Sequence, residues 1–217
     1  MGGMAQDRTQ GGAQESPRAA ARRQAILAAA RRVFVHDGYH SARLTDIAAQ
    51  AGCSVGTVYT YFEDRSELLS AVLEQVEQEM RGRNRTLRTD GDTVEEVKGS
   101  ISQANRFYLE SFRKNAKEMA LMEQVALSDP VFHRQRQERA ARFVKRNAGM
   151  IRTLQDKGIV RAGEDPEMLS AALSVMVSRL AYNAFVEGNF LSEYTVEQLA
   201  ETVDEVWFRT LGLEKVE

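Results

Sequence analysis

The chain has 217 residues, 43% of them hydrophobic, with 29 Lys and Arg against 31 Asp and Glu, so its formal net charge is -2. This length supports a hydrophobic core without disulfides, and the single cysteine excludes a disulfide framework and any multi-cysteine metal site. An aromatic content of 7% and only 3 prolines argue against a β-sandwich and against a disordered protein.

The first predicted helix follows a segment that lacks any apolar run. Residues 1–15 therefore predict a disordered tail rather than a signal peptide. Ser16 followed by Pro17 is typical of a helix start. Apolar residues then recur at helical spacing until Gly38, which predicts a helix over 17–37.

Two short helical patterns come next. Apolar residues recur at i, i+3, i+4 and i+7 over 44–51 and stop at Gly52. Two residues later, Ser54 is a candidate N-cap for a helix that ends near Thr60. The spacing predicts a helix-turn-helix, whose second helix can lie in the major groove of DNA.

A longer helix is predicted over 64–81, where Asp64 and Glu67 form a capping box. The polar segment 82–92 has no periodicity, and we place a domain boundary there. Beyond it, the pattern predicts five further helices, over 93–114, 116–127, 130–157, 166–187 and 195–211. We therefore predict an all-α protein of about nine helices: a helix-turn-helix domain over 16–63, a connecting helix over 64–81 and a larger body over 93–217.

The most apolar stretch runs from Pro166 to Val186. Arg179, Asn183 and three serines interrupt it, so we expect it to fall short of the roughly 18 to 20 apolar residues of a membrane span. We therefore expect a cytoplasmic protein without membrane contact.

The most specific signal is the string from Asp46 to Phe62, which reads DIAAQAGCSVGTVYTYF and is followed by Arg65 and by ELL over 67–69. It closely resembles the amino-terminal signature of the tetracycline-repressor (TetR) family of bacterial regulators, IA..AG.S.GT.Y.YF..K..L. The resemblance covers roughly residues 20–70. It implies a dimeric, ligand-responsive regulator, most often a repressor, whose partner is double-stranded operator DNA.

The resemblance also implies which side chains face the DNA. In the family, the positions of Thr57 and Tyr59 contact phosphates and base edges, and Gly56 leaves one side of the recognition helix free of bulk. For Tyr61 two roles stay open: packing in the core and contact with the DNA backbone. The candidate DNA-binding residues are Arg43, Ser54, Val55, Gly56, Thr57, Tyr59, Thr60, Tyr61 and Arg65.

Four positions depart from the family pattern, one of them Thr60, which stands where His is frequent. Ala42 stands where Thr is usual, and the neighbouring Arg43 either replaces that phosphate contact or is simply solvated. Val55 offers only apolar contact, for instance to a thymine methyl group. Arg65 stands where Lys is usual and keeps a charge for a phosphate.

Charge is divided unevenly along the chain. Residues 1–62 carry 7 arginines against 4 acidic residues, a net +3, whereas residues 63–217 carry 22 basic against 27 acidic residues, a net -5. Arg18, Arg22 and Arg23 lie on successive turns of the first predicted helix, where they either contact phosphates or form a solvated face. The basic part of the chain is therefore the part with the helix-turn-helix.

Dimerisation is expected because one recognition helix reads too few base pairs to find a site in a genome. A two-fold dimer reads two half-sites about 34 to 36 Å apart. The helix over 166–187 is apolar nearly all round, and the helix over 195–211 has apolar residues near heptad spacing. Both resemble the helices that form the dimer interface in the TetR family; the alternative is that they only close the core of a monomer.

The middle helices are rich in methionine and aromatic residues, which occur in cores and in adaptable apolar cavities. The family places its effector cavity among these helices, which implies a small, largely apolar effector: a fatty acyl compound, an aromatic compound or a hydrophobic drug. The candidate ligand-binding residues are Phe107, Tyr108, Phe112, Met119, Met122, Phe143, Met150, Met176, Arg179 and Asn183, with Asn105, Arg106 and Glu123 as further polar groups.

Other classes of function find little support. The sequence has no phosphate loop, no HExxH helix and no catalytic pattern around its three histidines, so we expect no enzymatic activity, no cofactor and no metal site. Cys53, Phe34, Ile47 and Phe62 are expected to be buried in the helix-turn-helix domain. The remaining alternative is a helical ligand-binding or scaffolding protein that has lost DNA binding.

Overall fold

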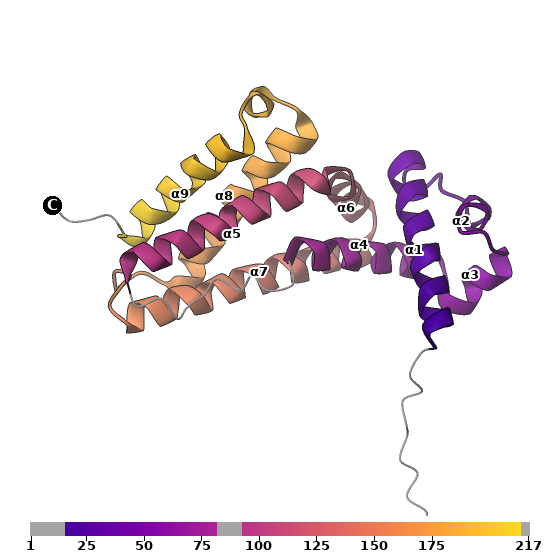
Figure 1. The fold of residues 1–217 in the computed structure, drawn as a ribbon, viewed down its shortest axis with the longest axis horizontal. Helices are drawn as coiled ribbons and strands as arrows, with labels where there is room; N and C mark the ends of the chain where they lie inside the picture. The colour runs from indigo at the N-terminus through magenta and orange to yellow at the C-terminus, as the bar shows by residue number, and fades with distance from the viewer. Residues whose placement is uncertain (1–15, 82–92, 214–217) are drawn as a thin grey trace, which may run out of the picture.

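A computed structural model describes residues 16–81 and 93–213 (Figure 1). Within these residues there are nine α-helices and no strand, which confirms the predicted all-α class and the order of the helices. The helices are α1 Pro17–Asp37, α2 Leu44–Gln50, α3 Val55–Tyr61, α4 Arg65–Arg81, α5 Val94–Lys114, α6 Ala116–Ser128, α7 Pro130–Asp156, α8 Pro166–Tyr182 and α9 Val196–Leu211. The expected tail over 1–15 and the expected boundary over 82–92 lie outside the described residues.

The helix starts follow from local side-chain chemistry. The Oγ of Ser16 accepts a hydrogen bond from the backbone N–H of Ala19 at 3.2 Å, as expected for an N-cap. The capping box predicted at α4 is only partly present. Asp64 accepts from the N–H of Glu67 at 2.8 Å, but the Glu67 carboxylate accepts from the N–H of Glu63, at 2.5 Å, instead of from that of Asp64.

The segment predicted as one helix over 166–187 changes its geometry near its end. α8 ends at Tyr182, and Asn183–Glu187 form one π-helical turn that stops at Gly188, whose φ is 64°. A 3-10 turn over Phe190–Glu193 then leads into α9. The predicted range is correct, but its last turn is wider than an α-helical turn.

The same segment, Pro166–Glu187, is long and apolar enough to cross a membrane by length and composition alone, with a mean hydropathy of 1.3. The expectation that it falls short of a span is wrong by this measure, because Arg179 is the only charged residue between Met168 and Val186. Core helices of soluble proteins pass the same test, so the finding is weak evidence for a span. Only 33% of the apolar window is buried within the chain, which leaves much of an apolar helix uncovered.

The head consists of α1 to α4 (Figure 1, right). Phe34, Ile47 and Phe62 are no more than 2% exposed, which confirms their predicted place in its core, whereas Cys53 is half-buried at the edge. This core does not stop at the head. Leu121, Val125 and Ala126 of α6, and Phe132 at the start of α7, belong to the same buried cluster. The head is therefore joined to the body by shared packing.

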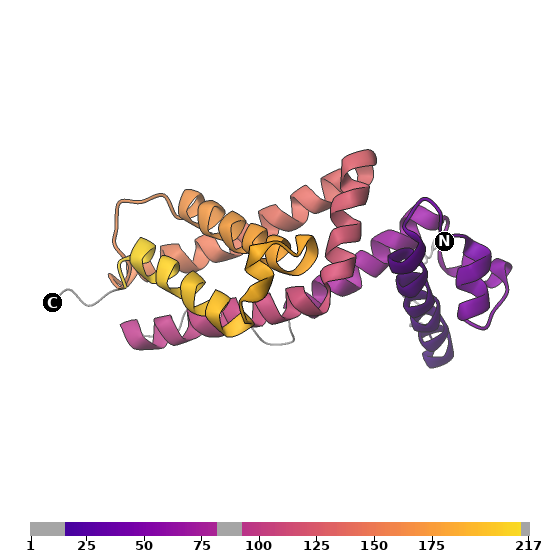
Figure 2. The same cartoon turned by 90° about the horizontal axis from the view of Figure 1, so that it is seen from above.

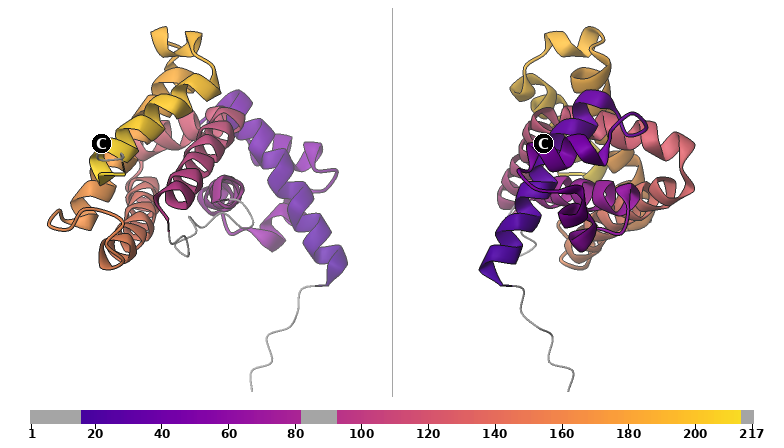
Figure 3. Two further views of the ribbon diagram at one scale, coloured as in Figure 1. Left: turned by 60° about the vertical axis from the view of Figure 1, so that its left-hand side comes forward. Right: turned by 90° about the vertical axis from the view of Figure 1, so that its right-hand side faces the viewer.

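The body is a bundle of α5 to α9. α7 runs along α8, and α5 runs along α9 (Figures 2 and 3). Their facing sides form a second core, which includes Leu173 and Trp207. α4 extends from the head into this bundle, where Val76 and Met80 join the body core. The single helix α4 therefore has one end in each core.

Candidate functional site

The helix-turn-helix lies at the outer end of the head, where α2 and α3 are far from the body (Figure 1). The chain turns between them at Gly52, whose φ of 63° is a left-handed value that glycine adopts without strain. Ser54 then caps α3, since its Oγ accepts from the backbone N–H of Thr57 at 3.1 Å. Val58 lies on the buried face of α3. This face packs on the head, and the opposite face of the helix is exposed.

The predicted DNA-binding residues fall into two groups by exposure. Arg43, Ser54, Gly56, Tyr59 and Thr60 are exposed, whereas Val55, Thr57, Tyr61 and Arg65 are half-buried. Tyr59 is 54% exposed and makes no hydrogen bond or ring contact with the described residues. The hydroxyls nearby are held by local hydrogen bonds: Thr60 donates to the carbonyl of Gly56 at 3.1 Å, and the Ser54 and Thr57 hydroxyls lie 2.9 Å apart. α3 thus presents a polar surface around an aromatic ring that no part of the described chain uses.

The half-buried residues also have roles within the fold. Val55 and Tyr61 pack against the head core. The guanidinium of Arg65 donates to the carbonyls of His40 and Ala42, at 3.0 and 3.2 Å. Arg65 therefore fixes the start of α4 on the loop that precedes α2, and its contact with a phosphate stays a prediction.

The arginines of α1 differ in their surroundings. Arg22 donates to two carbonyls of the turn between α2 and α3, both at 3.4 Å, and the Arg23 guanidinium lies 5.2 Å from the centre of the Phe62 ring. Arg18 and Arg43 are exposed and make no such contact with the described residues. Phosphate contact by any of them remains a prediction, and Arg18 and Arg43 have their charges fully available for it.

Gly56 offers a test of how closely α3 approaches another surface. A Cβ at this position would meet only the Oγ of Ser54, at 3.7 Å, so packing within the head does not require glycine. We expect Gly56→Ala to raise the free energy of unfolding by about 0.5 kcal/mol, because alanine favours the helix. We expect the same variant to bind DNA more weakly, because its methyl group stands on the exposed face. Thermal melts and DNA titrations measure the two effects.

The control is Gly52→Ala, whose positive φ predicts a loss of stability of about 1 kcal/mol from backbone strain. Unchanged DNA affinity in Gly56→Ala would contradict a close approach of α3 to the DNA.

A cavity of about 580 Å³ lies in the body. Five helices bound it: α4 contributes Met80, α5 Tyr108, α6 Met122, α7 Phe143 and α8 Ser174. A smaller cavity of about 50 Å³ shares several of these wall residues and therefore adjoins it. Burial raises the pKa of Tyr108 to about 12, because a charged phenolate is disfavoured away from water. The larger volume is within the range of cavities that bind small molecules.

Most of the predicted ligand-binding residues lie at these cavities. Tyr108, Phe112, Met119, Met122, Phe143, Arg179 and Glu123 line the larger cavity, and Phe107 and Asn105 line the smaller one. Met150, Met176, Asn183 and Arg106 line neither. Met150 is 5% exposed in the body core, and Met176 packs against that core. Ligand contact by the lining residues stays a prediction.

The charge of the cavity is the feature that sequence analysis missed. Six arginines of the described chain line it: Arg179 of α8, Arg81 of α4, and Arg136, Arg139, Arg142 and Arg146 of α7. The four on α7 are three or four residues apart, which places them on one side of the helix. This spacing is visible in the sequence, but a row of arginines on a long helix is typical of a solvated face.

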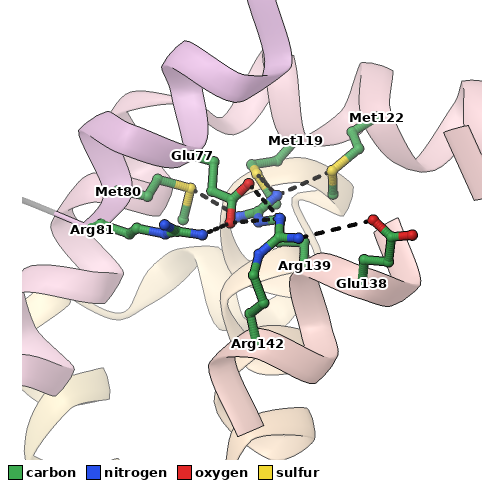
Figure 4. Close-up of polar contacts among 8 residues, drawn as sticks. All are labelled: Glu77, Met80, Arg81, Met119, Met122, Glu138, Arg139 and Arg142. Carbon is green, nitrogen blue, oxygen red and sulfur yellow. Dashed lines mark hydrogen bonds and ion pairs between the residues drawn. The ribbon is translucent and has the colours of Figure 1, made fainter. Parts of the chain in front are cut away.

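Most of these arginines pair with carboxylates. Glu77 accepts hydrogen bonds from Arg81 and from Arg142, the latter at 3.1 Å (Figure 4). Burial opposes the charge on Glu77, but the hydrogen bonds from the two arginines outweigh it and lower the pKa of Glu77. Arg142 also pairs with Glu138 at 3.9 Å, Arg136 with Glu123 at 3.0 Å, and Arg179 with Glu187 at 2.9 Å. Within the described residues, Arg139 and Arg146 belong to no ion pair.

A second set of polar contacts joins the wall of the cavity to the head. Arg31 of α1 donates to Glu118 at 2.7 Å and to Asn115 at 2.6 Å, both near the start of α6, and to Glu79 of α4 at 2.9 Å. Burial opposes the charge of Arg31, but its contacts with Glu118 and Glu79 outweigh it, so the pKa of Arg31 is raised. Met119, the next residue after Glu118, lines the cavity. α6 therefore connects the cavity to α1.

Comparisons with known proteins agree on the kind of domain at the amino-terminal end. Residues 26–72 match the family model of bacterial regulatory proteins, tetR family. Over 81 residues the chain is 37% identical to the HTH-type transcriptional activator FasR of Mycolicibacterium smegmatis, and this match spans 37% of either protein. Over 171 residues it is 27% identical to the HTH-type transcriptional repressor AcnR of Corynebacterium glutamicum, covering 76% of this chain and 85% of AcnR.

The fold of the body is shared as well. SmeT, the repressor of the Stenotrophomonas maltophilia multidrug efflux pump SmeDEF, superposes with a TM-score of 0.69 at 23% identity, over 89% of this chain and 93% of SmeT. The complex of SmeT with triclosan gives a TM-score of 0.71 at 25% identity, over 87% and 90%. The likeness therefore includes the helices around the cavity.

Proposed function

Because residues 26–72 match the family model of bacterial regulatory proteins, tetR family, we propose that this chain is a homodimeric TetR-family repressor of transcription that a small molecule releases from its operator DNA. The observation that carries the DNA-binding part is the exposed face of α3, where Tyr59 has no partner among the described residues. Two such helices, one from each protomer, would enter successive major grooves. Arg18 and Arg43 would add affinity by contacting phosphates, without reading sequence.

The dimer would form through α8, the π turn after it, and α9. Large apolar side chains are exposed there: Met168 is 68% exposed, Val175 64% and Val206 37%. Exposed apolar side chains grouped on two neighbouring helices favour an interface between protein chains. A second copy of this chain is the partner that a two-fold operator requires.

Release from the operator would depend on the helices that connect the cavity to the head. α4 lines the cavity with Met80 and begins at Arg65, next to the helix-turn-helix. α6 lines it with Met119 and Met122, while its Leu121 lies in the head core. A ligand that favours one arrangement of these two helices would change the separation of the two α3 helices and so the DNA affinity.

Relatives with the same domain act in both directions, since FasR is an activator and AcnR and SmeT are repressors. We propose repression because a cavity coupled to the head supports ligand-induced release. The triclosan complex of SmeT is a precedent for a small ligand on this fold. A regulator of this kind works in the cytoplasm, where it meets its DNA, and we expect no enzymatic activity.

Selection of bound fragments from random duplex DNA tests the DNA-binding part directly. We expect the full-length protein to enrich two inverted copies of one half-site, with centres about one helical turn apart. The logarithm of the affinity should fall linearly with the logarithm of the salt concentration, by about 0.9 per phosphate contact. Sequencing of the bound fragments and a salt titration measure both.

Two outcomes would contradict the proposal in different ways. Enrichment of a single half-site would exclude the two-fold dimer but keep DNA binding. Enrichment of no sequence would instead favour a helical ligand-binding or scaffolding protein that has lost DNA binding.

A further inference from the structure

The large cavity is positively charged, although the part of the chain that contains it is negatively charged. Among the described residues, six arginines and two glutamates line the cavity, an excess of four positive charges. Residues 63–217 carry 27 acidic against 22 basic residues. A partly enclosed space whose walls carry an excess of one sign of charge concentrates its field and favours ligands of the opposite sign.

Arg139 is one of the two arginines of the cavity wall that contribute to its excess of positive charge without an ion pair among the described residues. Its guanidinium is surrounded by the sulfur atoms of Met122, Met80 and Met119, at 3.1, 3.2 and 3.3 Å (Figure 4). A guanidinium has five N–H donors, and a thioether sulfur is a weak acceptor. Burial lowers the pKa of Arg139, and this effect outweighs the opposing effect of the nearby Glu77 and Glu123 carboxylates. The neighbouring Arg142, in contrast, pairs with Glu77.

Aromatic side chains also line the cavity that contains Arg139. The rings of Tyr108 and Phe143 lie 5.6 Å apart, and Phe112 lies 6.0 Å from Tyr108. Arg146, the second arginine without an ion pair among the described residues, has its guanidinium 5.0 Å from the centre of the Phe143 ring. A cationic group therefore sits inside a surface of methionine and aromatic side chains, which adapts to an apolar ligand of irregular shape.

We propose that the effector is an amphipathic anion, whose acidic head pairs with Arg139 while its apolar body lies among the methionine and aromatic side chains. This rests on the proposed function, since it names the class of small molecule that fills the effector cavity. A carboxylate or sulfonate accepts two parallel hydrogen bonds from a guanidinium, which three thioethers replace only poorly. The ion-pair partner that Arg139 lacks among the described residues would come with the ligand.

Two fluorescent probes that differ only in charge test this on the full-length protein. 8-Anilinonaphthalene-1-sulfonate is anionic, and N-phenyl-1-naphthylamine is the same ring system without the sulfonate. We expect the anionic probe to bind about tenfold more tightly, and Arg139→Met to remove this preference while leaving the neutral probe within about twofold. Methionine suits a site already formed by three methionines, so the variant should keep its fold, which circular dichroism checks.

Two matched variants complete the test. Arg139→Lys keeps a charge and should retain most of the preference, and Arg134→Met removes an exposed arginine of α7 that does not line the cavity and should change nothing. Equal binding of the two probes, or an unchanged preference in Arg139→Met, would overturn the anionic effector and leave the cavity intact. If neither probe binds, the effector cavity of the proposed function is overturned as well. The DNA-binding part of the proposed function is tested separately, by selection of bound DNA fragments.

Discussion

Tyr59→Ala is expected to weaken binding to the selected DNA about 30-fold, because a contact worth about 1 kcal/mol is lost in each of the two half-sites. Tyr59 is 54% exposed and has no partner among the described residues, so the free energy of unfolding should change by less than about 0.5 kcal/mol. Fluorescence anisotropy with the selected fragment measures the affinity, and chemical denaturation measures the stability.

Two further variants separate the contribution of the Tyr59 hydroxyl to DNA affinity from that of its ring, and the exposed face of α3 from its buried face. Tyr59→Phe removes only the hydroxyl and should recover the portion of affinity that comes from the ring. Val58→Ala, a change to the buried face of α3, should instead cost about 1 to 2 kcal/mol of stability through lost packing. If Tyr59→Ala binds the selected DNA as tightly as the parent, the exposed face of α3 is not the DNA-reading surface.

Arg31→Met is expected to lower the free energy of unfolding, because it removes polar contacts that join the head to the body. It removes the charged partner of Glu118, which is 8% exposed, and a donor to Asn115, which is 1% exposed. Leaving these groups buried without partners should cost about 2 to 3 kcal/mol, less than for a fully buried pair because Arg31 is partly exposed. Chemical denaturation measures the loss, and Arg32→Met, at the exposed neighbouring position, is the control.

The double variant Arg31→Met with Glu118→Met separates stability from coupling. Replacing both partners by apolar side chains removes the unpaired carboxylate, so we expect it to recover at least half of the lost stability. It should bind DNA and ligand, yet the ligand should change its DNA affinity less than in the parent, because α6 no longer holds α1 through these charges. A double variant with the full ligand effect would place the coupling in α4 alone.

The local rules of helix formation were sufficient to predict most of the fold. Caps such as Ser16, Ser54 and Thr93 and left-handed glycines such as Gly52 act within a few residues, so their effects are visible in the sequence. The same locality explains the error at α4, where Glu67 reaches the N–H of Glu63 instead of that of Asp64. Backbone N–H groups one residue apart are nearly equivalent targets for a flexible side chain.

The candidate sites were predictable to different degrees. The residues of α3 lie within one short segment, so their common face follows from helical periodicity alone. The cavity draws on five helices, and the sequence does not show which side of α7 faces α4, α5 and α6. Arg139 was therefore missed, whereas aromatic neighbours such as Tyr108 and Phe143 were found by their composition.

The sequence by itself determined the class of fold, the helix order and the candidate DNA-binding segment, because periodicity, caps and a continuous motif are all local. It also showed that residues 1–62, which include the helix-turn-helix, carry a net positive charge, whereas residues 63–217 carry a net negative charge. Only the tertiary structure decided that the negatively charged body encloses a positively charged cavity, that Arg139 lies among three methionines, and that Leu121 of α6 belongs to the head core. These features depend on contacts between residues far apart in the chain, which packing creates and local pattern does not encode.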